Sequence, residues 1–114
     1  NVITVYNGTG STIAVSRGLT ITKNSAGDLG VALSAVDVRP NCVSLEPIAD
    51  GEFGPAVLTN QAGIISFTAA GALSAGTAVT AAASGKISSG GSAAVGKNID
   101  ASTTDGDVIR VLVS

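Results

Sequence analysis

The sequence predicts an all-β fold, either a compact small β-barrel or a β-sandwich-like domain of short antiparallel strands. Short runs rich in Val, Ile and Thr alternate with clusters of Gly, Asn, Asp, Ser and Pro, which is the pattern of strands and turns. No segment shows an apolar period of 3.6 residues with helix caps at both ends. Hydrophobic residues make up 45% of the 114 residues and charged residues 12%, a balance that favours a folded chain over a disordered one.

The N-terminal residues are predicted to open the fold as a strand. Residues 1–6 (NVITVY) are rich in β-branched side chains. The dipeptide Asn7-Gly8 then favours a tight hairpin turn, with residues 13–16 as the return strand. Residues 1–16 are therefore expected to form an N-terminal hairpin or arm.

The rest of the first half is expected to continue as short strands joined by turns. Residues 24–28 (NSAGD) and 50–55 (DGEFGP) are rich in turn-forming residues. Pro40 lacks an amide donor and should lie at a strand end or edge. Strands are expected over residues 19–22, 29–33, 42–45, 56–59 and 63–68, the last two pairing across residues 60–62.

The stretch from Gly71 to Asp100 consists mostly of Ala, Gly, Ser and Thr, a composition that also occurs in flexible linkers. Val79, Ile87, Val95 and Ile99 recur in it at regular intervals, which predicts inward-facing residues of short strands. The expected elements are strands over 78–80, 86–88 and 93–99, turns at 84–85, 89–92 and 105–106, and the clearest strand of the chain within 107–114.

The two halves show a weak internal similarity. GLTIT at residues 18–22 resembles GTAVT at 76–80, and LGVA at 29–32 resembles AAVG at 93–96. Chance similarity among so many small residues is the alternative. A true repeat predicts two similar β units packed into one core, and we expect a single domain to cover residues 1–114.

The residue types argue against most catalytic and cofactor chemistry. The sequence contains no His, the commonest general base and a frequent metal ligand. Cys42 is the single Cys, which leaves it without a partner for a disulfide within the chain, and its apolar neighbours predict a buried small side chain. The six basic residues form no run, which argues against nucleic acid. No window contains the 18 apolar residues of a membrane span.

Acidic residues are paired in two turn-like segments. Asp50 with Glu52, and Asp105 with Asp107, each flank a glycine and are expected to be solvated turn residues. A glycosidase pair would need aromatic residues to hold a sugar, and the chain has only one Tyr and two Phe. Residues 100–107 (DASTTDGD) match a calcium loop poorly, because hydroxyl residues stand at two of its acidic positions. We therefore expect no catalytic residue, no metal and no cofactor.

A resemblance to a known family emerges over residues 72–113. The motifs there are A-G-x-x-V, x-G-K-I, a Ser/Gly-rich stretch, A-V-G and D-G-D-V-I-R-V-L, in that order. With these motifs the chain resembles the capsid decoration proteins of tailed bacteriophages, also called head cement or head fibre proteins. Residues 38–57 depart from the family pattern. The matching residues are Gly18, Ile21, Leu29, Gly30, Val31 and Ala32 in the first half, and Gly76, Val79, Gly85, Lys86, Ile87, Ala94, Val95, Gly96, Gly106, Val108, Arg110, Val111 and Leu112 in the second.

The resemblance implies a structural protein without catalytic activity. Such proteins bind the exterior of an assembled capsid, commonly as homotrimers that bridge neighbouring capsomers. The implied partner is the major capsid protein, and the implied location is the outside of the virion, after synthesis in the cytoplasm of the bacterial host. The alternative is a carbohydrate- or receptor-binding β module of a phage fibre or a bacterial surface protein.

Two regions are the candidate contacts with the capsid or with another subunit. A strand at a chain end can add to the sheet edge of a partner, and an exposed aromatic residue can anchor an interface. The alternatives are an ordinary core strand and a Phe packed on its own domain. The residues expected at the interface are Val2, Ile3, Val5, Tyr6 and Phe53.

Overall fold

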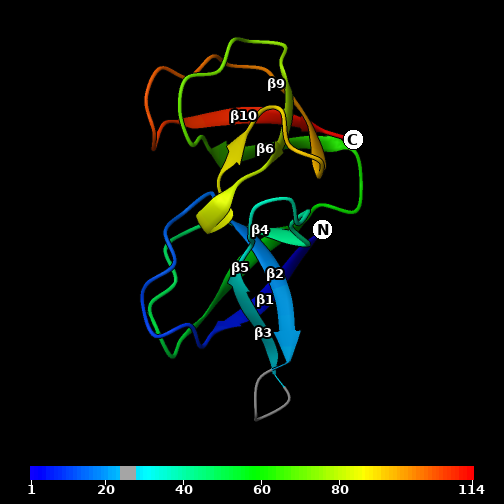
Figure 1. Ribbon diagram of the computed structural model, residues 1–114. Coiled ribbons are helices and arrows are strands. Elements are labelled where there is room, and N and C mark those ends of the chain that lie inside the picture. The colour runs from blue at the N-terminus through cyan, green and yellow to red at the C-terminus, as the bar shows by residue number, and fades with distance from the viewer. Residues whose placement is uncertain (24–27) are drawn as a thin grey trace.

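The computed structural model describes residues 1–23 and 28–114, and the regular structure in these residues is almost entirely β-strand (Figure 1). Within the described residues, the one helical turn is η1 (Ala83–Gly85), of the 3-10 type. The strands are β1 (Val2–Asn7), β2 (Gly18–Lys23), β3 (Leu29–Leu33), β4 (Cys42–Ser44), β5 (Phe53–Leu58), β6 (Gly63–Thr68), β7 (Ala78–Ala81), β8 (Ile87–Ser88), β9 (Ala94–Asn98) and β10 (Val108–Val113).

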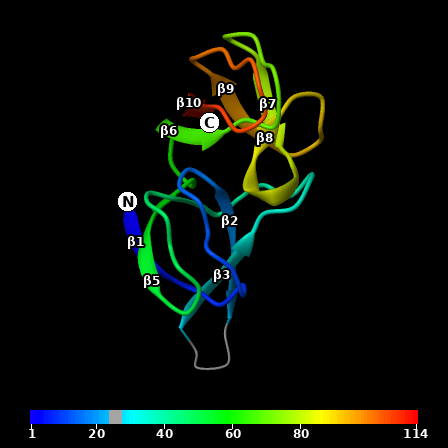
Figure 2. The same cartoon turned by 90° about the vertical axis from the view of Figure 1, so that its left-hand side faces the viewer.

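These strands form two sheets, one from each half of the chain. The first half closes a barrel in the order β1-β3-β2-β4-β5, in which β1 and β3 run parallel. The second half forms a sheet in the order β6-β10-β9-β7-β8, in which all neighbours are antiparallel. Figures 1 and 2 show the two sheets stacked along the long axis of the molecule. The predicted all-β fold of short strands in two units is confirmed.

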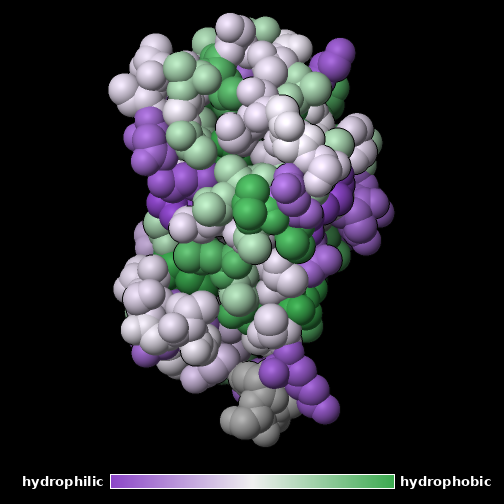
Figure 3. Space-filling model, viewed as in Figure 1, coloured by the Kyte–Doolittle hydropathy of each residue, from purple (hydrophilic) through white to green (hydrophobic). Residues whose placement is uncertain are grey.

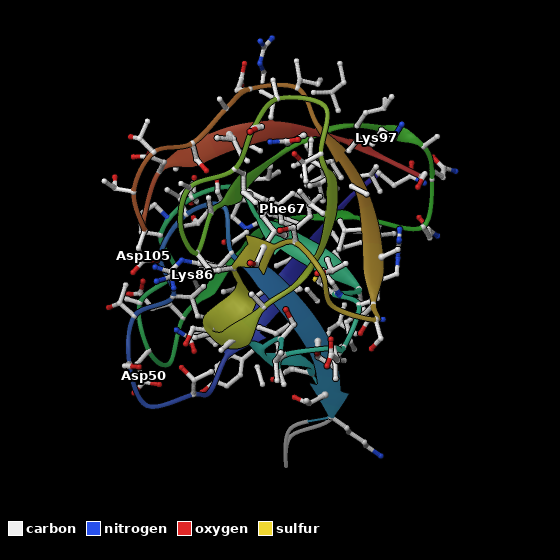
Figure 4. The ribbon with its side chains drawn as sticks, turned by 45° about the horizontal axis from the view of Figure 1, so that its top comes forward. Asp50, Phe67, Lys86, Lys97 and Asp105 are labelled. Atoms are coloured by element: carbon white, nitrogen blue, oxygen red, sulfur yellow. The ribbon has the colours of Figure 1, made fainter. Side chains whose placement is uncertain are left out.

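The expected single core is wrong, because each sheet has its own apolar core and the two cores meet where the sheets are stacked. Val5, Leu19 and the Cys42 side chain lie in the barrel core. The second core surrounds Phe67, which is fully buried and is labelled in Figure 4. Val43, on the opposite face of β4 from Cys42, is buried in this second core. Alternation along β4 thus places one residue in each core.

The predicted strand positions within each half are largely confirmed. β2 and β3 occupy the predicted segments, and β7 and β8 form the expected hairpin across η1. Three of the regularly spaced residues of the Ala-rich stretch are fully buried: Val79, Ile87 and Val95. Ile99 is 38% exposed, so the prediction that it points inward is wrong. It follows β9, outside the strand whose alternation was expected to bury it.

The predicted N-terminal hairpin does not form. β1 pairs with β5 over residues 2–6 and with β3 at Tyr6 and Asn7, whereas Ile13 forms only an isolated bridge with Ile48. The reason is the Asn7 side chain, which is buried. Its amide nitrogen donates to the carbonyl oxygens of Ser11 and Ile48, both at 2.8 Å. Asn7 therefore anchors a loop to the barrel.

Two further expectations about the middle of the chain are wrong. The segments 56–59 and 63–68 do not pair, because β5 closes the barrel against β1 and β4 while β6 joins β10 in the other sheet. Residues 53–55, expected in a turn, open β5, and the turn is confined to the preceding residues. Of the turn expected at 24–28, residues 24–27 lie outside the described part of the chain.

The two halves share several local features, although their strand orders differ and the matching residues are shifted from the sequence-based alignment. β1 and β5 pair antiparallel as β6 and β10 do, and the bridge between Ile13 and Ile48 corresponds to one between Leu73 and Ser102. Ser16 and Gly76 both have left-handed backbones, with φ of 60° and 77°. Ser16, and not Gly18, is therefore the equivalent of Gly76.

The two sheets are joined by hydrogen bonds as well as by apolar packing. The amide of Thr68 donates to the Ser16 carbonyl at 2.9 Å, and the amide of Gly85 donates to the Ser34 carbonyl at 2.9 Å. Arg39 donates from one guanidinium nitrogen to the Thr59 carbonyl and from another to the Ala94 carbonyl, each at 2.9 Å. These bonds tie together segments that are far apart in the sequence.

Candidate binding surface

The acidic residues considered as catalytic or calcium-binding groups have structural partners. Asp50 accepts a hydrogen bond from the amide of Gly10 at 2.9 Å. Asp105 forms an ion pair with Lys86 at 2.8 Å (Figure 4). The Asp107 carboxylate accepts hydrogen bonds from the backbone amides of Thr103 and Thr104. These hydrogen bonds hold the pKa of Asp107 below its ordinary value. These carboxylates hold turns in shape, as polar residues in turns commonly do.

The Cys42 thiol lies in the barrel core with no exposed surface. Loss of hydration raises its pKa from 9.0 to about 11. A thiol of this kind stays protonated at neutral pH and is a poor nucleophile, because the thiolate is the reactive form. The prediction that Cys42 serves as a small buried side chain is confirmed.

The residues predicted at an interface divide between the inside and the outside of the barrel. Val5 is fully buried, and Ile3 packs against the same core, because alternate residues of β1 point inward. Val2 is 64% exposed and Phe53 is 57% exposed. Tyr6 lies opposite Phe53 in the pairing of β1 with β5, with ring centroids 5.1 Å apart and ring planes tilted by 59°. The outer face of β1 and β5 thus carries an aromatic pair.

The equivalent face of the second sheet carries an apolar pair that the sequence did not single out. Ile64 of β6 lies opposite Leu112 of β10, and both side chains are more than half exposed. The repeat relates this pair to Val2 and Val57 on β1 and β5. The sequence did contain a signal for this exposed pair, because apolar residues of β10 occupy both its buried and its exposed face. Val2, Val57, Ile64 and Leu112 form what we call the outer apolar pairs; Val57 is the half-buried member and packs against the second core.

A groove lies between the barrel and the second sheet. Its volume is about 330 Å³. In both ribbon views β6 lies above the end of the barrel that holds the N-terminus (Figures 1 and 2). We call it the junction groove, and its lining residues, all uncharged, are Ser16, Ser44, Leu45, Val57, Ile64, Ile65 and Ser66.

Charged groups near the outer apolar pairs are compensated on β10. The Arg110 guanidinium donates to both carboxylate oxygens of Asp100, at 2.9 and 2.8 Å. These hydrogen bonds lower the pKa of Asp100 to about 2 and raise the pKa of Arg110. Arg110 lies opposite Ser66 in the pairing of β10 with β6. The sheet face beside Ile64 therefore carries an internally neutralised ion pair.

A second hollow has a more polar lining than the junction groove. Its volume is about 430 Å³, and it is lined by Arg39, Asn41, Thr59 and the residues that follow Thr59. Its Arg39 guanidinium already binds carbonyl oxygens of both sheets. On the face drawn in Figure 3, hydrophobic surface is gathered toward the middle of the molecule, where barrel and second sheet meet.

The described residues contain neither a metal-binding cluster nor a membrane-spanning helix. No three Cys, Asp or Glu side chains of residues 1–23 and 28–114 come together as ligands for an ion. Across the same residues, no helix is long and apolar enough to cross a bilayer.

Comparison with known proteins identifies the fold. No family model matches the chain, and no curated protein sequence matches it. A solved structure does: the N base of the head fiber protein gp8.5 of bacteriophage phi29. It superposes with a TM-score of 0.80 over 100% of this chain and 93% of that chain, at 15% sequence identity. The two proteins therefore share a fold along their whole length.

Proposed function

We propose that this chain is a structural protein of a bacteriophage virion that binds the outside of the assembled capsid and stabilises it. The observation that carries the proposal is the whole-chain match to the base of a phage head fiber protein. The motifs over residues 72–113, which resemble those of capsid decoration proteins, independently favour the same class of protein.

The surface supports a binding role based on contact area. Exposed hydrophobic side chains lie on the β1/β5 and β6/β10 faces, namely those of Val2, Phe53, Ile64 and Leu112. Exposed apolar groups of this kind gain free energy when they are covered by a partner, at about 25 cal/mol per Å². We propose the major capsid protein as that partner and a homotrimer as the bound form, with binding that involves no catalytic step.

Stabilisation would follow from mass action. A protein that binds the mature shell better than its precursor shifts the equilibrium toward the mature shell by its difference in affinity. Many copies on a symmetric lattice, each bridging neighbouring capsomers, add their modest individual contributions. The mechanism needs a rigid body, and the hydrogen bonds between the two sheets supply one.

A second candidate function rests on the pair of half-buried Tyr6 and exposed Phe53. Sugars stack on aromatic rings, so the pair favours the alternative of a carbohydrate- or receptor-binding module of a fibre or surface protein. The two proposals differ in their partner. Mature capsids purified without this protein should take it up in a cosedimentation experiment until saturation at a ratio set by the lattice. Absence of uptake by capsids, together with binding to cell-wall glycans, would overturn the capsid proposal.

A further inference from the structure

The strand β6 has a free hydrogen-bonding edge beside the junction groove. The amide of Ala69 donates to the Asp107 carbonyl, whereas the amide of Thr68 donates to Ser16 in the barrel. Backbone groups of successive residues point to opposite sides of a strand. The odd-numbered residues of β6 therefore face β10, and Ile64 and Ser66 direct their backbone N–H and C=O groups away from it.

These backbone groups have no partner among the described residues. Neither Ile64 nor Ser66 makes a hydrogen bond on the side away from β10, and both residues are exposed. Each contributes one donor and one acceptor, at the two-residue spacing of a strand. An extended backbone matches such a row, and an open sheet edge is a common place for a partner strand to add.

The groove limits what can bind along this edge. The position beside Thr68 is already taken by Ser16, so the free part of the edge runs only from Ile64 to Ser66. Leu45 and Val57 form apolar walls, and no lining side chain carries a charge. A charged side chain placed here would lose hydration without an ionic partner, which is costly. The edge therefore suits a short, extended and uncharged segment with small or apolar side chains.

We infer that the edge of β6 at Ile64 and Ser66 binds an extended, uncharged segment of the capsid shell protein by strand addition. This inference rests on the proposed function and names the contact by which it would operate. Ile64 lies on this edge strand, and its exposed side chain would be partly covered by the added strand.

The inference is tested by removing one backbone donor from the free edge. Ser66→Pro deletes an amide that points away from β10, and proline is tolerated on the open side of an edge strand. Ser66→Ala is the matched control, because it removes the hydroxyl and keeps the amide. Binding to mature shells purified without this protein is measured by cosedimentation. We expect Ser66→Pro to weaken binding at least tenfold and Ser66→Ala to change it less than twofold.

The outcomes separate the inference from the function on which it rests. If wild type and Ser66→Ala bind the shells and Ser66→Pro binds equally well, the inference is overturned while the proposed function stands. If wild type itself fails to bind, the proposed function is overturned. Should Ser66→Pro fail to fold, hydrogen exchange of wild type decides. We expect exchange at Ile64 and Ser66 to be fast in the free protein and at least tenfold slower on the shell, and unchanged exchange there would refute strand addition.

Discussion

Replacing Gly85 by alanine tests how tightly the two sheets are fitted together. Gly85 has a left-handed backbone with φ of 70°, which costs a residue with a side chain about 1–2 kcal/mol. An alanine Cβ would clash with the carbonyl oxygen of Gly18 and would lie 3.0 Å from its nitrogen. Both atoms belong to the backbone of β2, so they cannot rotate away as a side chain would. Overpacking of this kind adds about 1–3 kcal/mol.

Gly76→Ala is the matched control for this variant. Gly76 has φ of 77°, and a Cβ there would meet no atom within 4 Å, so only the backbone cost applies. We expect Gly85→Ala to lower the free energy of unfolding by about 2–5 kcal/mol and Gly76→Ala by about 1–2 kcal/mol. Urea unfolding followed by circular dichroism measures both. Equal losses in the two variants would refute the close contact between η1 and β2.

Three further predictions concern the core and two titrating groups. Phe67→Ala should lower the free energy of unfolding by about 3–5 kcal/mol in urea titrations, and a loss below about 1 kcal/mol would contradict its place in the second core. Because the pKa of Cys42 is raised in the folded state, the unfolded chain loses the thiol proton at lower pH. The free energy of unfolding should therefore fall between about pH 9 and pH 11. Cys42→Ala should remove this pH dependence. Because the pKa of Asp100 is lowered, its pairing with Arg110 stabilises the fold above its ordinary pKa of 3.8, and this stabilisation is lost as the pH falls toward 2. Asp100→Asn should lack this contribution when the free energy of unfolding is measured against pH in acid. An unchanged pH dependence would count against the pair.

Local strand positions could be predicted from the sequence because they depend on neighbouring residues. Apolar and Thr residues alternate in β2, and β10 is rich in Val. Both patterns are typical of a pleated strand with one buried face. Strand partners could not be predicted in the same way. β1 pairs with β5, about fifty residues away in sequence, and barrel closure sets that pairing.

The Asn7-Gly8 dipeptide shows how a local turn signal can mislead. Asn-Gly favours hairpins because both residues tolerate positive φ. Here no positive φ occurs at Asn7, and its buried side chain donates to the carbonyl oxygens of Ser11, in the loop that follows, and of Ile48, in a distant segment. The dipeptide indicates which backbone conformations are allowed locally. The burial of the Asn7 amide depends on Ile48 in a distant segment, which the local pattern does not include.

The candidate surface was predicted in part. Because side chains alternate along β1, Val2 and Tyr6 face outward when Val5 faces inward. Which of the two faces is the inner one becomes known only once the pairing with β5 is fixed. Ile64 and Leu112 escaped notice because an apolar residue in a strand is usually a core residue. Their exposure on one sheet face is a property of the assembled fold, as is the free edge of β6.

Binding to mature capsids, compared with their precursor shells, tests the central claim most directly. Purified protein is titrated onto both kinds of shell, and bound copies per shell are counted after sedimentation. We predict saturable binding to the mature shell at a lattice-defined ratio, weaker binding to the precursor, and a higher dissociation temperature for the decorated shell. Equal absence of binding to both shells, or binding without any gain in shell stability, would contradict the claim that this protein holds a capsid together.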